Sequence, residues 1–156
     1  MKNLVFILIL MATLVSGCKN TDNQKVIKTN TEVSNKQVNK ITSNNWIENI
    51  QLNHTEKWNA NIETNEGVEK MQQSLKSQST NTLEEYHELA KLLNIGKNYV
   101  IRNCSMKGES HDNLHVWLLP LIAKIDALSE AKTIENASAI KKSIQENIEI
   151  YYTYFK

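Results

Sequence analysis

The stretch of sequence that decides the fold is LHVWLLPLIAKIDAL, residues 114–128. Its apolar positions recur in alternating steps of four and three, and they are Leu114, Leu118, Leu121, Ile125 and Leu128. Side chains at this spacing line one side of a helix, and the alternation is typical of helices that pack in a bundle. Pro120 removes one backbone hydrogen bond and crowds the preceding turn, so a kink is predicted between Val116 and Pro120. A break is not expected, because the apolar positions continue beyond the proline.

Three further segments show the same helical period. The first covers about residues 66–78, the second runs from about residue 81 to Cys104, and the third covers about residues 134–154. Their apolar positions are Val68, Met71 and Leu75; Leu83, Tyr86, Ala90, Leu93, Val100 and Cys104; and Ala137, Ile140, Ile144, Ile148, Tyr151 and Phe155. Four amphipathic helices joined by short connections predict an all-α fold, an antiparallel four-helix bundle, in a domain of residues 45–156.

Polar residues predict where two of these helices begin. Asn81 or Thr82 can cap the second helix, because their side-chain oxygens accept hydrogen bonds from the first free backbone amides. Ser110 is the predicted N-cap of the helix that contains residues 114–128, and Asp112 suits the positive end of that helix. Gly96 lies inside the second helix and predicts a local bend.

Two aromatic stretches flank the four helices. Residues 45–62 alternate imperfectly between apolar and polar, so a short helix and an extended cover over the bundle both remain open. Trp46 and Trp58 within them are expected to pack on the core, because large aromatic side chains supply much buried area. At the other end, residues 151–155 read YYTYF, for which packing at the end of the last helix is favoured over a groove for a ligand or partner helix.

The N-terminus carries a secretory signal. Lys2 is followed by an apolar run too short to span a bilayer, and small residues precede a cysteine in LVSGC, residues 14–18. This arrangement resembles the lipobox of bacterial lipoproteins. The resemblance implies a signal peptide over residues 1–17, acylation of Cys18 by chains such as palmitate, and a lipid-anchored protein of the bacterial cell envelope, outside the cytoplasm.

A tether is predicted to join the lipid to the bundle. Residues 18–44 are rich in Asn, Lys, Thr and Ser and show no sustained period, which favours a disordered, flexible segment. Removal of residues 1–17 would remove one basic residue of 18, leaving 17 basic and 17 acidic residues. A neutral chain has no electrostatic surface for nucleic acid, so no nucleic-acid partner is expected. Nothing in the sequence supplies a recognisable oxyanion site or paired carboxylates, and the chain is predicted not to be an enzyme.

One segment departs from ordinary bundle composition. Residues 104–115 read CSMKGESHDNLH and place Cys104, Met106, His111 and His115 around the connection between two helices. The two histidines are four residues apart, so on a helix they share one face. Thiolate and thioether are soft ligands that select copper(I), and imidazole also binds copper. These four residues are therefore the predicted metal ligands, with copper(I) as the expected ion and Met71 as a candidate further ligand.

Other readings of the same cluster stay open. Zinc and non-covalent haem fit less well, because no paired-cysteine zinc pattern and no C-x-x-C-H haem attachment motif occurs. Cys104 has no cysteine partner if Cys18 is acylated, and as a buried, inert thiol it would leave a non-catalytic interaction module that binds an envelope protein and no metal. Residues 58–156 also resemble small helical extracytoplasmic lipoproteins of bacteria, in which a segment similar to 104–115 joins two bundle helices. That resemblance implies the fold and no established activity.

Overall fold

The computed structural model describes residues 36–156. Four long helices dominate it, α2 (Ile62–Ser77), α3 (Leu83–Asn103), α4 (Glu109–Glu130) and α5 (Ile134–Tyr154), and a 3₁₀ turn, η1 (Asn45–Glu48), precedes them. The predicted all-α bundle is confirmed. The predicted signal peptide, Cys18 and the first part of the predicted tether lie outside the described residues. None of the helices described is long and apolar enough to cross a membrane.

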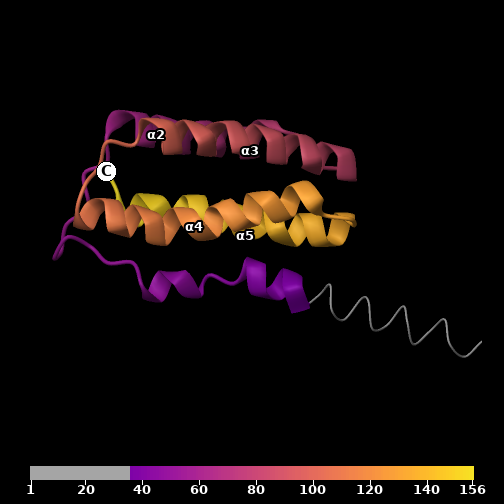
Figure 1. The fold of residues 1–156 in the computed structure, drawn as a ribbon. Helices are drawn as coiled ribbons and strands as arrows, with labels where there is room; N and C mark the ends of the chain where they lie inside the picture. Colours follow the sequence, from indigo (N-terminus) through magenta and orange to yellow (C-terminus); the bar gives the residue numbers. More distant parts are fainter. Residues whose placement is uncertain (1–35) are drawn as a thin grey trace, which may run out of the picture.

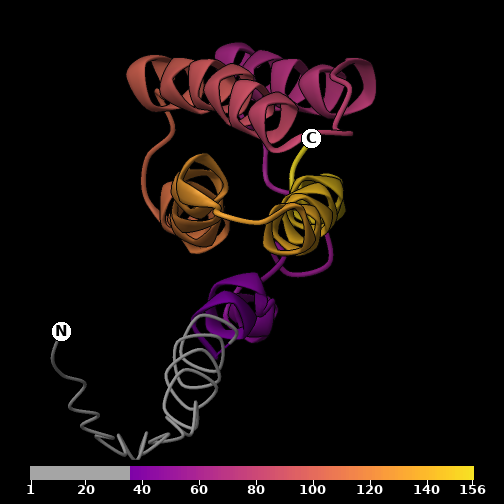
Figure 2. The same ribbon diagram turned by 90° about the vertical axis from the view of Figure 1, so that its right-hand side faces the viewer.

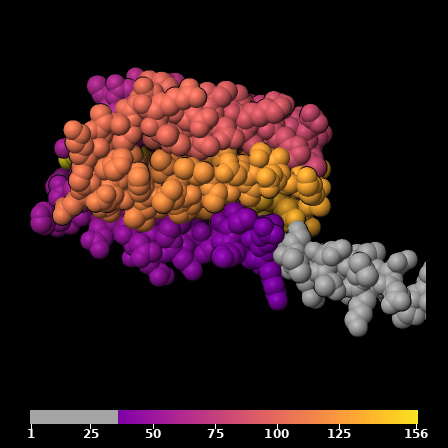
Figure 3. All heavy atoms as spheres, viewed as in Figure 1, coloured from indigo at the N-terminus to yellow at the C-terminus, as the bar shows by residue number. Residues whose placement is uncertain are grey.

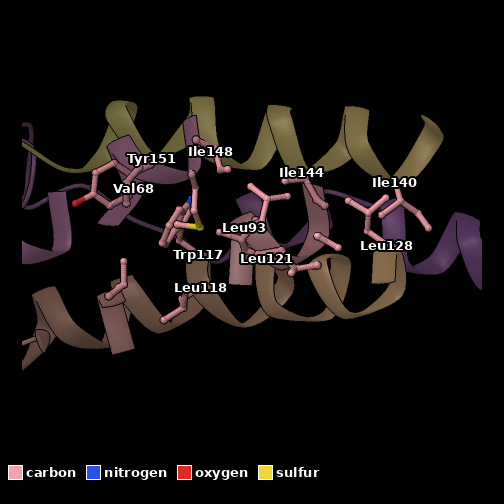
Figure 4. Close-up of a cluster of buried hydrophobic side chains, with 14 of the residues drawn as sticks. Val68, Leu93, Trp117, Leu118, Leu121, Leu128, Ile140, Ile144, Ile148 and Tyr151 are labelled. Atoms are coloured by element: carbon pink, nitrogen blue, oxygen red, sulfur yellow. The ribbon is translucent and has the colours of Figure 1, made fainter. Parts of the chain in front are cut away.

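The bundle consists of two helix pairs. α2 and α3 lie side by side in one layer, and α4 and α5 form a second layer beneath them (Figures 1 and 2). Apolar side chains from all four helices fill the space between the layers, and part of this cluster is drawn in Figure 4. The cluster includes Val68, Leu93, Leu121, Ile144 and Tyr151, which are completely buried.

The five predicted seam positions of α4 are all buried in this core, from Leu114 to Leu128. Trp117 lies among them, and its indole nitrogen donates a hydrogen bond of 2.8 Å to the Asn147 carbonyl on α5. The helix continues through Pro120, as the sequence predicted. Burial of this seam is thus what joins α4 to the rest of the bundle, since each large apolar side chain removed from water contributes about 1.5–3 kcal/mol.

Helix starts agree with the sequence at one position and differ at another. Thr82 caps α3 in a capping box, in which its side chain accepts from the Glu85 amide and the Glu85 carboxylate accepts from the Thr82 amide. The prediction that Ser110 caps α4 is wrong. The N-cap is Gly108, with a positive φ of 61°, a conformation that glycine adopts without the steric cost of a Cβ. The Ser110 hydroxyl instead donates to the Lys107 carbonyl.

α2 and α3 approach each other closely at two glycines. A Cβ on Gly67 would collide with Val100 Cγ2, and a Cβ on Gly96 would lie 2.5 Å from Met71 Cγ and 3.0 Å from the Gly67 carbonyl oxygen. Gly96 therefore does more than loosen α3, which is continuous through it. The absence of a side chain at both positions lets the two backbones pack directly against each other.

A segment N-terminal to the four helices also belongs to the folded domain. Residues 36–42 are helical, η1 follows, and together residues 36–50, here called the strap, run along the α4–α5 layer (Figures 1 and 3). Two of its own side chains, Trp46 and Ile50, are buried in the core cluster. The predicted flexible tether is therefore wrong for residues 36–44. The apolar pattern there is weak, and the segment is held partly by polar contacts to the bundle, which a sequence pattern does not indicate.

One of these polar contacts involves Lys124 of α4, whose side chain is fully buried. Its Nζ donates to Asn44 Oδ1 of the strap at 2.6 Å, to Asn147 Oδ1 at 2.8 Å and to the Ser143 carbonyl at 3.4 Å. Asn44 Nδ2 in turn donates to Glu146 Oε2 at 3.0 Å. The three donors of an ammonium group are thus matched by three neutral oxygen acceptors, and one of the three comes from the strap.

The close contact of α2 and α3 predicts that Gly67→Ala and Gly96→Ala each destabilise the chain by about 1–3 kcal/mol, the usual cost of overpacking. Helix propensity alone predicts the opposite sign, since alanine in a helix interior is favoured over glycine by about 1 kcal/mol. Urea unfolding measures the effect, with Gln73→Ala on the exposed face of α2 as the control. Stabilisation by either glycine variant would contradict the close approach.

Burial of Lys124 predicts a dependence of stability on pH. Loss of hydration lowers the pKa of Lys124 from 10.5 to about 8, and the Glu146 carboxylate partly opposes this shift. Between these values the unfolded chain holds a proton that the folded chain has released, so stability rises with pH. We expect the stability of the wild type to rise relative to Lys124→Met by up to about 3 kcal/mol from pH 8 to 10.5. Urea unfolding at several pH values measures the difference in stability between the two proteins. Titration of the tyrosines is common to both proteins and cancels in this difference. A difference that does not change with pH would contradict the prediction.

Candidate functional site

The connection from α3 to α4 brings the predicted ligands to one end of the bundle. α3 ends at Asn103, and Cys104 leaves the helix with an extended backbone while its amide still bonds to the Val100 carbonyl. Gly108 then turns the chain directly into α4, so His111 lies in the first turn of that helix. The two side chains therefore face each other across a connection of only five residues, 104–108.

Two of the predicted ligands are in contact. Cys104 Sγ lies 3.7 Å from His111 Nδ1, and Cys104 is partly buried. The ring of His115, one helical turn further along α4, lies with its centroid 4.3 Å from that of His111 at an interplanar angle of 51°. His115 is exposed, so its ring has room to turn. The structure thus joins a thiol and two imidazoles in a row from the half-buried Cys104 to solvent.

The two predicted methionine ligands are placed differently. Met106 lies in the same connection, where its partly buried side chain packs against the core. Met71 is fully buried against Gly96, eight residues before Cys104 on α3. That separation corresponds to about 12 Å of helix rise, so Met71 does not reach the pair. The structure thus places Met71 in the core between α2 and α3, away from the pair that it was predicted to join.

In the described part of the chain, no preassembled metal centre accompanies the pair. Within residues 36–156, no group of three or more His, Cys, Asp or Glu side chains is arranged to hold a metal ion. His87 lies at the far end of the bundle, where its Nε2 is 2.9 Å from the Ala131 carbonyl oxygen. The arrangement at Cys104 is therefore a two-residue thiol–imidazole pair with further donor groups nearby.

The surroundings of Cys104 are polar on one side and aromatic on the other. Asn61, just before α2, donates to the Asn103 carbonyl at 3.0 Å and accepts from the Ser105 amide at 3.4 Å. Tyr151 of α5 donates to Asn65 Oδ1 at 2.7 Å. Burial raises the pKa of Tyr151 well above its ordinary value, and the neighbouring Tyr152 and Cys104 add to that rise. The phenol consequently stays protonated and keeps its role as a hydrogen-bond donor.

The C-terminal aromatic cluster serves mainly as core. Tyr151 stacks on Phe155 with centroids 4.9 Å apart and also lies 4.9 Å from the Trp117 ring. Both Tyr151 and Phe155 are buried, as the favoured interpretation of YYTYF predicted. Tyr154 instead lines an open hollow of about 690 Å³ together with Trp58.

Sequence reasoning missed the residues that hold this end of the bundle in place. Asn61 and Asn113 are ordinary polar residues in the sequence, and nothing in their spacing shows that each bonds to a residue far away in the chain. An asparagine immediately before a helix was the one usable signal, since it is a favoured capping residue. No protein-family model, curated protein or solved structure matches the chain.

Proposed function

We propose that this chain is a membrane-tethered protein that captures copper(I) outside the cytoplasm, with Cys104 and His111 as its anchoring ligands. The predicted signal peptide and the acylation of Cys18 supply the location. The helical domain supplies the site, at the end of the bundle where α3 and α4 meet. Its role is non-catalytic: it binds and buffers the ion.

The observation that carries the proposal is the 3.7 Å distance between Cys104 Sγ and His111 Nδ1. Protein-bound zinc, a metal of similar size, lies about 2.3 Å from sulfur and about 2.0–2.1 Å from nitrogen, which at a tetrahedral angle separates the two donor atoms by about 3.6 Å. The two side chains therefore already stand at the separation that a shared metal ion requires. In the metal-free chain the same distance suits a thiol–imidazole contact.

The donor types favour copper(I) over zinc. A structural zinc site is closed by four protein ligands, whereas here only two donors are in contact. Copper(I) accepts few ligands and prefers soft ones such as thiolate and thioether. Exposed His115 can add a second imidazole by turning its ring, and Met106 can add a thioether from within the connection. Each of these additions requires a side-chain movement and leaves the helices in place.

A second candidate function is a non-metal interaction module of the envelope. Leu92 and Ile95 lie three residues apart on α3, and both side chains are exposed, Ile95 by 64%. Side chains at this spacing share one face of a helix. Such a face would bind a partner without involving Cys104, and this candidate predicts no effect of Cys104 substitutions on function.

Copper(I) binding tests the proposal. The full chain with Cys18→Ser has Cys104 as its only thiol, and its affinity for copper(I) is measured anaerobically by competition with a chromogenic chelator. We expect Cys104→Ala to weaken binding by at least about 100-fold and His111→Ala by about 10–100-fold, because loss of even outer-shell partners costs that much. Affinity should also fall at acidic pH, since the thiol must lose its proton and the imidazole must be neutral.

His87→Ala provides the matched control, because it removes an imidazole from the far end of the bundle. Its affinity should equal that of the parent chain. Equal binding by the parent, Cys104→Ala and His111→Ala would refute the proposed site and leave the interaction module as the remaining candidate.

A further inference from the structure

The end of the bundle that holds Cys104 and His111 is covered by residues 51–61, here called the cap segment. This segment continues directly from the strap and crosses the bundle end on its way to α2, on the left of Figure 1. Midway, the Trp58 amide donates to the Tyr154 carbonyl at 2.8 Å, and the Lys156 amide donates to the Trp58 carbonyl at 2.9 Å. The cap segment is thus attached to the C-terminal end of α5 by main-chain hydrogen bonds.

One end of the cap segment holds the helix that carries His111. The Gln51 amide donates a 2.8 Å hydrogen bond to Asn113 Oδ1, and Asn113 lies two residues after His111 in the first turns of α4. Ile50, the last residue of the strap, is buried immediately before this contact. The buried end of the strap therefore places the start of the cap segment beside the first turns of α4.

The other end of the cap segment holds Cys104. The Asn61 side chain bonds to both neighbours of the cysteine, Asn103 and Ser105, and it also accepts a 2.6 Å hydrogen bond from the Thr64 hydroxyl. Each partner of the thiol–imidazole pair is thus positioned by a different end of the same segment. A displacement of the cap segment would loosen both partners at once.

The strap itself is held by a few polar contacts, by the buried Trp46 and Ile50, and by the partly buried Val38 and Ile47. Asn44 bonds to Lys124 and Glu146, and the Ser143 hydroxyl donates to the Thr42 carbonyl at 2.8 Å. Segments with so few anchoring contacts open more readily than the helices of the core. Asn44 is the central contact, because its side chain bridges α4 and α5.

We propose that the strap and the cap segment form a gate over the Cys104–His111 pair, closed when Asn44 is bound to Lys124 and opened when the strap detaches. Detachment frees Gln51 from α4, and the loosened cap segment then exposes the thiol and lets the imidazoles move. The purpose of the gate, control of metal entry and release, rests on the proposed function. The existence of the gate does not depend on the proposed function, because opening changes the access of any reagent to Cys104.

Alkylation of Cys104 in the metal-free full chain tests the gate. With Cys18→Ser as background, the chain is purified in detergent and treated with iodoacetamide, while hydrogen exchange reports the opening of residues 36–50. Asn44→Ala should accelerate both exchange of the strap and alkylation of Cys104, each by about tenfold, because it removes one hydrogen bond to a buried ammonium group and one to Glu146. Ser143→Ala, which removes a strap contact from the α5 side, should act in the same direction by about threefold.

Asn45→Ala is the matched control, because Asn45 is the exposed neighbour of Asn44 and should leave both rates unchanged. Faster strap exchange with unchanged alkylation would overturn the gate. Unchanged strap exchange in both Asn44→Ala and Ser143→Ala would overturn the claim that the Asn44 contact keeps the strap attached to the bundle. The alkylation and exchange experiments use metal-free protein, so their outcome does not depend on whether the chain binds copper(I). The gate and the proposed function can therefore be refuted independently.

Discussion

A buried ammonium group is the constraint on which the outer part of this structure depends. Lys124 stands on the core-facing side of α4, and a charge removed from water is tolerated only where hydrogen-bond acceptors replace the lost hydration. α5 supplies two of these acceptors, and the strap supplies the third through Asn44. The strap is therefore required to complete the solvation of a charge that the α4–α5 layer cannot satisfy alone. From this contact follow the position of the cap segment and the enclosure of the bundle end.

The sequence predicted the parts of the fold that depend on local periodicity and capping. The steps of four and three in α4 appear in the structure as a completely packed seam, and Thr82 caps α3 with Glu85 as its partner. The burial of the Lys124 ammonium group could not be predicted from the sequence, because a lysine on an apolar face commonly extends its charged end to solvent. The strap was missed for the same reason. Its docking depends on hydrogen bonds between residues about 80 or more positions apart, which leave no periodic trace.

The candidate site shows a similar division between local and distant information. Cys104 and His111 were predicted as ligands of one site because both lie around the connection between two helices, and the structure places them in contact. The position of Met71 along the bundle depends on the register between α2 and α3, and that register is set by the close contact of Gly67 with Gly96. The same glycines that draw α2 and α3 together thus fix Met71 beside Gly96 in the core, away from the bundle end. Ser110 failed as a cap because Gly108 already supplies the turn that α4 needs.

The incompleteness of the donor set bears on what such a site would be for. A structural metal site holds all its ligands in place and contributes directly to folding, whereas this domain has an extensive apolar core built from all four long helices. A thiol–imidazole pair with an exposed second imidazole instead resembles an open site, in which the last ligands arrive with the ion. Because those ligands must move, affinity would depend on how freely the connection between α3 and α4 can adjust. Asn61 restrains that connection and Gln51 restrains the first turns of α4, so an ion held by the pair would be coupled to the position of the cap segment through the same few hydrogen bonds.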